Sequence, residues 1–467
     1  MLYKLKDVVQ VLKNNDRKMK TLTNIISKIL NLTLEDSHFS EVLKGGVVSF
    51  LIRILTITLS YIFILIVSRA YGAEAVGILS LCITFIGIAT FISQFGFETS
   101  LVRFIAQFNA TGKKDLIKEC YFKSLKFVVP FSILITIFVF LLSDLLAIYL
   151  FKKPQLGKYF LLSSLAITPS VLIAINRGAL RGLKKIRESS LFERGSDFFL
   201  GIIFLIGFLV LTPQKPIYPL ISMIAGIYLS AIISQILWSK YLNSNPANKC
   251  LNSISYRQLL NISLSMLIIS SMHFIMRWTD IVMLGIFCSE KEIGIYSVAI
   301  KIANTTTIML IAVNSIAGPK FAELYTQNDT YNLKKVVHYS SKLIFWSSAP
   351  LLLIFLFLPQ TVLDIFGPEF RKGAVALRIL TIGQFVNSIS GSVGYFLYMT
   401  GREKIFQVIL FLAAFMNVTI NYCLIPKYGI IGAALGTSIS IIFWNVASVI
   451  YARISSGILT FYIPNFR

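Results

Sequence analysis

The sequence predicts an all-α polytopic membrane protein of about 12 transmembrane helices, in two parallel-repeat six-helix lobes around a central cavity. Three observations carry this prediction: the composition, a series of apolar runs and an internal repeat. Of the 467 residues, 56% are hydrophobic and 14% are charged, whereas soluble proteins carry about 25% charged residues. The apolar runs are about 20 residues long, which is the length that crosses the hydrocarbon core of a bilayer.

The apolar runs also divide the chain into parts. They lie near 46–68, 75–97, 124–146, 158–176, 197–212, 217–238, 258–287, 293–316, 339–358, 374–397, 404–424 and 431–453. The expected parts are a basic cytoplasmic N-terminal segment (1–44), an N-terminal six-helix lobe (45–240), a cytoplasmic linker (241–257), a C-terminal six-helix lobe (258–455) and a cytoplasmic tail (456–467). The N-terminal segment lacks the apolar core of a signal peptide. Its apolar residues at helical spacing among lysines fit either an amphipathic helix on the membrane surface or an extended tail.

The distribution of basic residues predicts the orientation. With a cytoplasmic N-terminus, about 31 of the 44 Lys and Arg fall on the cytoplasmic side, about 10 fall outside and about 3 fall within spans. The opposite orientation would invert this bias, so we expect both termini in the cytoplasm. The net charge of +23 is then a property of the cytoplasmic loops and does not indicate a nucleic-acid partner.

The internal repeat relates the two halves of the chain. The segment GAEAVGILSL (72–81) resembles SEKEIGIYSV (289–298), and an offset of 217 aligns Gly77 with Gly294. The same offset takes Arg103 and Phe104 to Lys320 and Phe321. Because the offset contains six spans, both halves enter the membrane in the same direction, as in transporters that work by rocking two lobes in alternating access.

Motifs of enzymes and metal sites are missing. The five cysteines and three histidines are scattered, which argues against a zinc site or a disulfide framework. The segment GAEAVG has the glycine spacing of a phosphate loop, but Ile78 replaces the required lysine. Gly72 and Gly77 are instead expected to shape a tight turn and a close helix approach. We therefore expect a transporter with no catalytic residues, no cofactor and no metal, and not an enzyme.

Ionisable residues inside the spans are the strongest candidates for function, because each costs about 2.5 kcal/mol or more at bilayer depth. Arg53 lies about seven residues into the first span, a depth of about 10 Å. It could equally reach back to the interface. Lys301 lies about eight residues into the eighth span and shares a helix face with Asn304. This face predicts a cavity wall.

The seventh span carries a polar stripe. Ser270, His273, Arg277 and Asp280 recur at i, i+3, i+7 and i+10, and so lie on one face of a helix. Such a face is expected to line the cleft between the lobes. We also expect Arg277 and Asp280 to pair at rest, in an ion pair that an anionic substrate could break.

Charges near span ends are expected to anchor the spans or to carry little functional signal. They are Arg69, Arg103, Arg177, Arg181, Arg378, Glu98 and Asp197. The basic clusters GKKDLIK (112–118) and RGLKKIR (181–187) are expected to contact anionic membrane lipids.

Three segments carry a resemblance to a known family. They are VSRAYGAEAVGILSLCITF (67–85), GALRGLKK (178–185) and RWTDIVMLGIFCSEKEIGIYSVAIKIA (277–303). They resemble the polysaccharide flippases, the Wzx-like exporters of O-antigen and capsule repeat units in the multidrug/oligosaccharidyl-lipid/polysaccharide superfamily. The similarity covers residues 41–455. It implies a multidrug-exporter-like fold that moves undecaprenyl-pyrophosphate-linked oligosaccharide across the bacterial inner membrane.

The resemblance also implies roles for the candidate residues. Members of this family are thought to offset the charge of the pyrophosphate with cationic residues in the cavity. By position, Arg53, Arg277 and Lys301, with Asn304 beside Lys301, are the candidates here. Asp280 and His273 are the candidates for coupling transport to H⁺ or Na⁺.

Other functions remain as alternatives. A multidrug or cation antiporter of the same fold would place acidic residues in the N-terminal lobe of the cavity, and spans one to six show none at mid-depth. A lipid II-type flippase is expected to have two further C-terminal spans. A membrane polymerase or glycosyltransferase generally needs a sizeable outer loop, and the longest outer loop expected here is 359–373.

Overall fold

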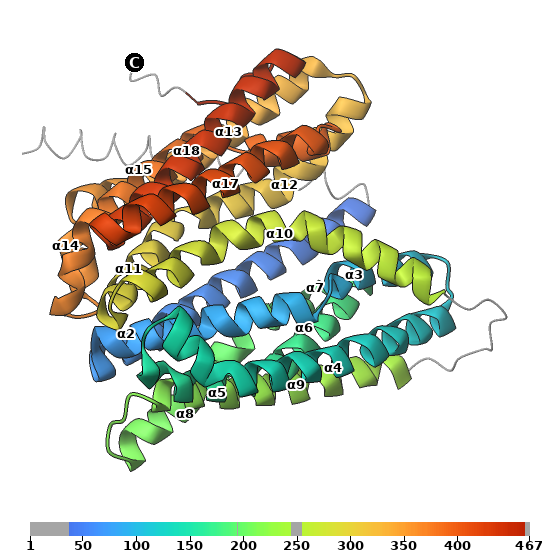
Figure 1. The fold of residues 1–467 in the computed structure, drawn as a ribbon. Coiled ribbons are helices and arrows are strands. Elements are labelled where there is room, and N and C mark those ends of the chain that lie inside the picture. Colours follow the sequence, from blue (N-terminus) through green and yellow to red (C-terminus); the bar gives the residue numbers. More distant parts are fainter. Residues whose placement is uncertain (1–36, 194, 244–254, 463–467) are drawn as a thin grey trace, which may run out of the picture. The chain divides into compact units, whose positions relative to one another are not determined.

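In a computed structural model, the described backbone comprises residues 37–193, 195–243 and 255–462, and its secondary structure is helical throughout. The chain forms two compact units, Met1–Phe50 and Leu51–Arg467. The following description concerns the second unit (Figure 1). Most of the predicted N-terminal segment and of the linker, and the end of the predicted tail, lie outside the described residues.

The helices, in chain order, have the following bounds. They are α2 (Ser37–Ser93), α3 (Phe97–Ala110), α4 (Lys114–Leu145), η1 (Leu146–Leu150), η2 (Pro154–Leu156), α5 (Gly157–Ser164), α6 (Ile167–Gly182), α7 (Ile186–Leu191), α8 (Gly195–Leu211), α9 (Tyr218–Asn243), α10 (Tyr256–Phe287), α11 (Glu290–Asn304), α12 (Thr307–Thr326), α13 (Thr330–Phe357), α14 (Pro359–Asp364), η3 (Pro368–Gly373), α15 (Ala374–Ser390), α16 (Val393–Met399), α17 (Glu403–Tyr428) and α18 (Ile430–Ser456).

Many of these helices can cross a membrane. Among the described residues, seven are long and apolar enough to do so, and α5 and α6 add an eighth if this pair, bent by 43°, is one span. Helices α3 to α9 pack mainly on one another, and α10 to α18 do the same. This packing confirms an all-helical membrane fold. The count of 12 spans, the division into two six-helix lobes and the cytoplasmic position of both termini stay predictions.

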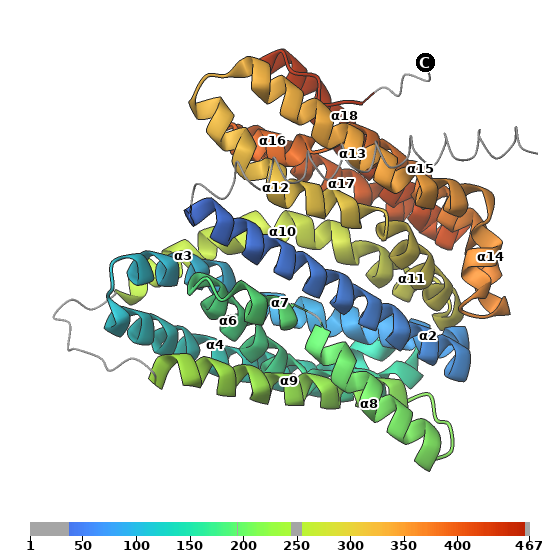
Figure 2. The same cartoon turned by 180° about the vertical axis from the view of Figure 1, so that it is seen from behind.

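Helix α2 contains the first two predicted spans and is broken at Gly72. This residue has φ 80° and ψ −177°, a backbone conformation that L side chains rarely adopt. The chain reverses its direction there, so that α2 has a first arm before Gly72 and a second arm after it (Figures 1 and 2). The prediction that Gly72 shapes a tight turn is confirmed.

Gly77 and Gly294, the residues that the repeat aligns, lie against each other. A Cβ atom on Gly77 would lie 1.7 Å from the carbonyl oxygen of Glu290, and one on Gly294 would lie 1.9 Å from that of Ala73. The offset of 217 also relates Ala73 to Glu290. The second arm of α2 therefore meets its own repeat copy, α11, in a reciprocal contact of the kind that a two-fold axis produces.

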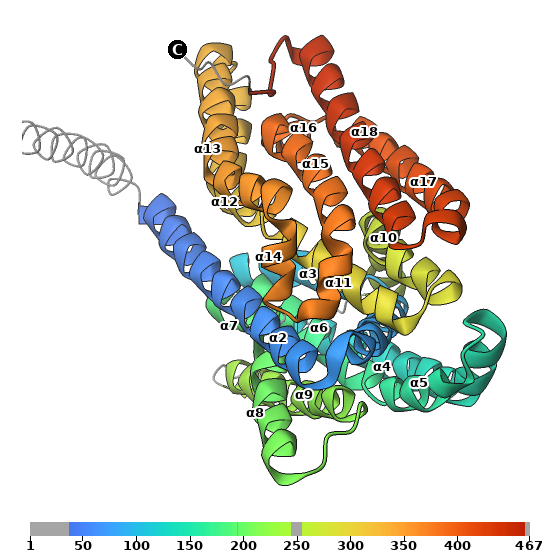
Figure 3. The same cartoon turned by 90° about the vertical axis from the view of Figure 1, so that its left-hand side faces the viewer.

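Polar contacts reinforce this end of the unit, which we call the latch end and define by residues 69–77, 288–294 and 364–371. Arg69 donates to the carbonyl oxygens of Asp364 (2.9 Å) and Ile365 (2.8 Å), and its expected role as an interface anchor stays a prediction. Glu369 accepts from the backbone N–H of Ala73 (3.3 Å) and pairs with Lys291 (2.6 Å). Figure 3 shows α14 beside the kink of α2.

An ion pair between Lys291 and Glu369 adds to the helix packing at the latch end. The hydrogen bond from Lys291 holds the pKa of Glu369 below its ordinary value. A carboxylate with a lowered pKa keeps its charge, and its contribution to this contact, throughout the neutral range, and loses both only as the pH falls through that lowered pKa. The pair of Glu369 with Lys291 therefore stays charged at neutral pH.

The glycine contact predicts the effect of a single methyl group. Gly77→Ala should lower the free energy of unfolding by about 1–3 kcal/mol, because the added Cβ overlaps the backbone of α11. Thermal unfolding of the purified protein in detergent measures this loss. Gly207→Ala in α8 is the matched control, since no atom lies within 4 Å of a Cβ there. Equal midpoints for the two variants would show that the helices do not meet at Gly77.

Candidate functional site

A cavity of about 940 Å³ lies among α2, α3, α6, α8, α9, α10, α11 and α12. On the first arm of α2 its lining ends at Ile64, and on the second arm it resumes at Ser80. On α10 the lining ends at Ile281, and on α11 it begins at Ser297. The residues between these positions include the glycine contact, so the cavity lies on the side of the unit away from the latch end.

The wall of the cavity carries five cationic and four acidic side chains. They are Arg53, Arg177, Arg181, Arg277 and Lys301, and Glu98, Glu193, Asp197 and Asp280. Buried charges are costly unless they are paired or hydrogen-bonded, so the partner of each one decides what it can do.

Two of the predicted cations are held by neighbours. Arg53 forms an ion pair with Glu193. Lys301 donates to the carbonyl oxygen of Ser60 (2.8 Å), and its ammonium stands 5.0 Å from the ring centroid of Tyr61. Both contacts join residues far apart in sequence. The first arm of α2 is thereby fixed to α11 and to the segment before α8.

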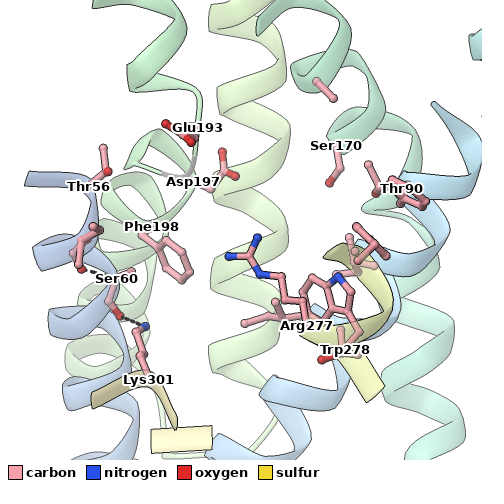
Figure 4. A pocket seen from close by; sticks show the side chains of 18 of the residues that line it. Thr56, Ser60, Thr90, Ser170, Glu193, Asp197, Phe198, Arg277, Trp278 and Lys301 are labelled. Atoms are coloured by element: carbon pink, nitrogen blue, oxygen red, sulfur yellow. Dashed lines mark hydrogen bonds between the residues drawn. The ribbon is translucent and has the colours of Figure 1, made fainter. Parts of the chain in front are cut away.

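Arg277 is held differently. Its guanidinium projects between the two walls of the cavity in Figure 4, and lies 5.9 Å from the ring centroid of Trp278. Within the described residues, no carboxylate lies within ion-pair distance of Arg277. Arg277 therefore lines the cavity without a direct ion-pair partner among the described residues.

The predicted ion pair between Arg277 and Asp280 is not present. Asp280 is 1% exposed and accepts hydrogen bonds from Tyr296 of α11 (2.6 Å), Asn421 of α17 (2.7 Å) and Thr437 of α18. The prediction was wrong because neutral donors from three other helices satisfy this carboxylate, which sequence spacing along α10 cannot reveal.

Of the three remaining predicted residues, two line the cavity. Asn304 lines the cavity, and its Oδ1 atom accepts from Gln384 of α15 (3.0 Å). Ser270 also lines the cavity. The side chain of His273 lies outside the described residues.

An ion pair that the sequence did not indicate lies at the cavity wall. Arg177 donates two hydrogen bonds to Glu98, of 2.8 and 2.7 Å, and two more to the carbonyl oxygens of Phe192 (3.2 Å) and Glu193 (3.3 Å). Because both lie near span ends, Arg177 was expected to anchor its span at the interface and Glu98 to carry little functional signal. The bidentate geometry instead ties α6 to the start of α3.

The N-terminal half also supplies more acid to the cavity than expected. Glu98, Glu193 and Asp197 line it from helix ends rather than from mid-span. Glu98 and Glu193 are paired with arginines, and Asp197 accepts from Ser196 (3.3 Å). These side chains come from helix ends, so the expectation that spans one to six carry no acidic residue at mid-depth stays a prediction.

Comparisons with known families give matches to two family models. The model described as polysaccharide biosynthesis protein matches residues 42–325, and the MatE model matches residues 262–423. The first match covers more than half of the chain.

Individual relatives are distant and cover different shares of the chain. A membrane protein of Methanocaldococcus jannaschii is 24% identical over 86% of this chain and 82% of its own length. A probable low-salt glycan biosynthesis flippase of Haloferax volcanii is 24% identical over 44% of this chain and 43% of its own length. A structure of the lipid II flippase MurJ in an inward closed conformation has a TM-score of 0.70 at 15% identity, over 88% of this chain and 87% of that one. The structural likeness confirms the predicted exporter-like fold.

The buried ion pair predicts a test of stability. Glu98→Ala should lower the free energy of unfolding by about 3 kcal/mol or more, because it leaves Arg177 uncompensated in a part-buried site. Glu323→Ala is the matched control, since its exposed pair with Lys320 should contribute no more than about 0.5 kcal/mol. Thermal unfolding in detergent measures both. A loss in Glu98→Ala as small as in the control would mean that the pair is not formed.

Proposed function

The chain belongs to the polysaccharide biosynthesis protein family, the polysaccharide flippases of the multidrug/oligosaccharidyl-lipid/polysaccharide superfamily, and we propose that it flips undecaprenyl-pyrophosphate-linked oligosaccharide repeat units across a bacterial inner membrane. The observation that carries this proposal is Arg277. A guanidinium without a carboxylate partner, inside a membrane cavity, suits a ligand that brings its own negative charge.

The rest of the cavity supports a pyrophosphate ligand. Two phosphates present several oxygens, and a guanidinium binds such oxygens in bidentate geometry. Lys301 stands across the cavity from Arg277 in Figure 4, and Arg53, from the N-terminal half of the chain, is paired with Glu193 in the cavity wall. An entering pyrophosphate can take Arg53 from Glu193, so that cations from both halves of the chain surround it.

The latch end supports alternating access. With the N-terminus in the cytoplasm, the latch end faces outward and the cavity faces the cytoplasm, where lipid-linked repeat units are assembled. Opening outward requires the contact of Gly77 with α11 to separate, together with the contacts of Arg69 and Glu369. Release of the substrate on the outer side is thus coupled to breaking a reciprocal, two-fold-like contact.

Asp280 is the proposed site of ion coupling. It is a buried carboxylate whose neighbours are neutral oxygen and nitrogen groups, and the Oδ1 atom of Asn421 beside it is buried without a partner among the described residues. The hydrogen bonds of Asp280 are satisfied, but among the described residues no cation pairs with it, so H⁺ or Na⁺ can balance its charge. Since its hydrogen bonds join α10 to α11, α17 and α18, the bound ion can bias how these helices pack.

A second candidate is export of an organic cation in exchange for an ion. Glu193 and Asp197 in the cavity wall favour it, because a cationic drug needs an acidic partner. The two functions differ in which member of the Arg53–Glu193 ion pair the substrate binds. An anionic substrate would pair with Arg53 in place of Glu193, whereas a cationic substrate would pair with Glu193 in place of Arg53.

Removal of the uncompensated cation is the first test. Arg277→Ala should reduce surface polysaccharide about 10- to 100-fold in a strain that depends on this gene, since one charge-assisted contact contributes about 1.5–3 kcal/mol. Arg277→Lys should restore part of the activity, because the charge is kept and the bidentate geometry is lost. Arg378→Ala is the control, since Arg378 is exposed, donates to the carbonyl oxygen of Leu356 and lies outside the cavity lining.

Two results would contradict the proposal. One is full activity from Arg53→Ala, Arg277→Ala and Lys301→Ala, each tested singly. The other is export of ethidium by the wild-type protein that Glu193→Gln abolishes and Arg277→Ala leaves intact, which would favour the second candidate.

Neutralising Asp280 is the test of ion coupling. Asp280→Asn should lower transport about 10-fold or more and remove its dependence on a H⁺ or Na⁺ gradient, because the buried charge that the ion balances is gone. Transport in proteoliposomes with each gradient imposed separately distinguishes the two ions. Asp329→Asn is the matched control, since Asn serves as well as Asp at the cap of α13. An unchanged gradient dependence in Asp280→Asn would exclude this residue.

A further inference from the structure

One wall of the cavity is aromatic and is built from two facing helices. On the second arm of α2, Gly87, Phe91 and Gln94 share a face, and on α10, Phe274 and Trp278 do the same. The rings of Phe91 and Phe274 stack with centroids 3.8 Å apart and planes inclined by 19°. A Cβ atom on Gly87 would lie 2.7 Å from the ring of Trp278, so only glycine leaves room for the indole there.

The same wall contains buried polar atoms without hydrogen-bond partners among the described residues. Among the described residues, Nε1 of Trp278, Oγ1 of Thr90 and Oε1 of Gln94 are buried and make no hydrogen bond. All three residues line the cavity. Each such atom costs about 1–3 kcal/mol, so three together on one wall are expensive for a purely structural role. Nε1 of Trp278 is a donor, Oε1 of Gln94 is an acceptor, and the hydroxyl of Thr90 can donate or accept.

We propose that this wall, made of Thr90, Phe91, Gln94, Phe274 and Trp278, binds the sugar ring that is joined to the pyrophosphate. A sugar ring has an apolar C–H face, which packs on aromatic rings, and a rim of hydroxyl groups, which satisfy both donors and acceptors. A polyprenyl tail would bury against the same rings and leave all three polar atoms unpaired. This inference rests on the proposed function and extends it from the charge of the substrate to its glycan.

The position of Arg277 supports the assignment. In a lipid-linked oligosaccharide the first sugar is bonded directly to a phosphate oxygen, so their two subsites must adjoin. Arg277 and Trp278 are consecutive on α10, and the guanidinium lies 5.9 Å from the indole ring. Figure 4 shows Trp278 and Thr90 on one side of Arg277, and Ser60 and Lys301 on the other. The cationic and aromatic sides of the cavity thus meet at Arg277.

Substitutions on this wall separate binding from folding. Thr90→Val and Gln94→Leu replace an unpartnered buried polar group by an apolar one of similar size, which should leave the free energy of unfolding unchanged or raise it. Trp278→Phe keeps an aromatic ring and removes the N–H donor. Thr419→Val on α17 is the matched control, because Thr419 is exposed and its hydroxyl bonds to the carbonyl oxygen of Phe415.

The experiment compares two classes of probe on the purified full-length protein in detergent by calorimetry. One probe is farnesyl pyrophosphate, and the others are the same compound carrying a single glucose or a single N-acetylglucosamine. The wild type should bind at least one sugar-bearing probe about 10-fold more tightly than the bare pyrophosphate. Thr90→Val, Gln94→Leu and Trp278→Phe should each weaken that binding about 3- to 10-fold and leave the bare pyrophosphate unaffected. Arg277→Ala should weaken the binding of all three probes.

The outcomes distinguish the two claims. If the wild type binds all three probes equally and the wall variants change nothing, the sugar subsite is refuted while the proposed function stands. If the wall variants weaken the bare pyrophosphate as much as the sugar-bearing probes, the wall serves the pyrophosphate and the subsite is likewise refuted. If the wild type binds none of the probes, the proposed function fails, and the subsite with it.

Discussion

Compensation of charge inside a low-dielectric cavity is the constraint on which the rest of this structure depends. Arg177 is neutralised by Glu98, Arg53 is neutralised by Glu193, and Asp280 is surrounded by neutral donors. Arg277 has none of these arrangements within the described residues. A protein that carries such a cation into a membrane gains most when the missing charge arrives with the substrate. Under the proposed function, this imbalance suits the cavity to an anionic lipid.

The internal repeat also accounts for the contact that separates the cavity from the latch end. Gly77 and Gly294 occupy equivalent positions in the two halves and meet each other, so the contact that closes the latch end is the contact between the two copies. Two glycines are needed because each must approach a backbone oxygen of the partner helix. The cavity lies away from this contact, and its aromatic and cationic sides both draw residues from both halves of the chain. In the proposed transport cycle, binding and gating would therefore depend on the same three helices, α2, α10 and α11.

The sequence was sufficient for features that depend on periodicity and insufficient for those that depend on distant contacts. The spacing along α10 placed Arg277 and Asp280 at the cavity, and the repeat identified Gly77 and Gly294. The partner of Asp280 was predicted wrongly, because its donors come from residues as far away as Thr437. The pair of Glu98 with Arg177 joins positions 79 residues apart, and both lie at helix ends where interfacial anchoring is the usual expectation. No periodic pattern encodes either contact.

Because the cationic and aromatic sides of the cavity are proposed to bind different parts of the substrate, the substrate itself is the best probe. Arg277 lies where the cationic side meets the aromatic side, so it should touch the group that joins lipid to glycan. A structure of the full chain with undecaprenyl pyrophosphate bound measures this directly. A guanidinium nitrogen of Arg277 should lie about 2.7–2.9 Å from a phosphate oxygen. A pyrophosphate bound elsewhere, with Arg277 still facing an empty cavity, would contradict the role of this residue.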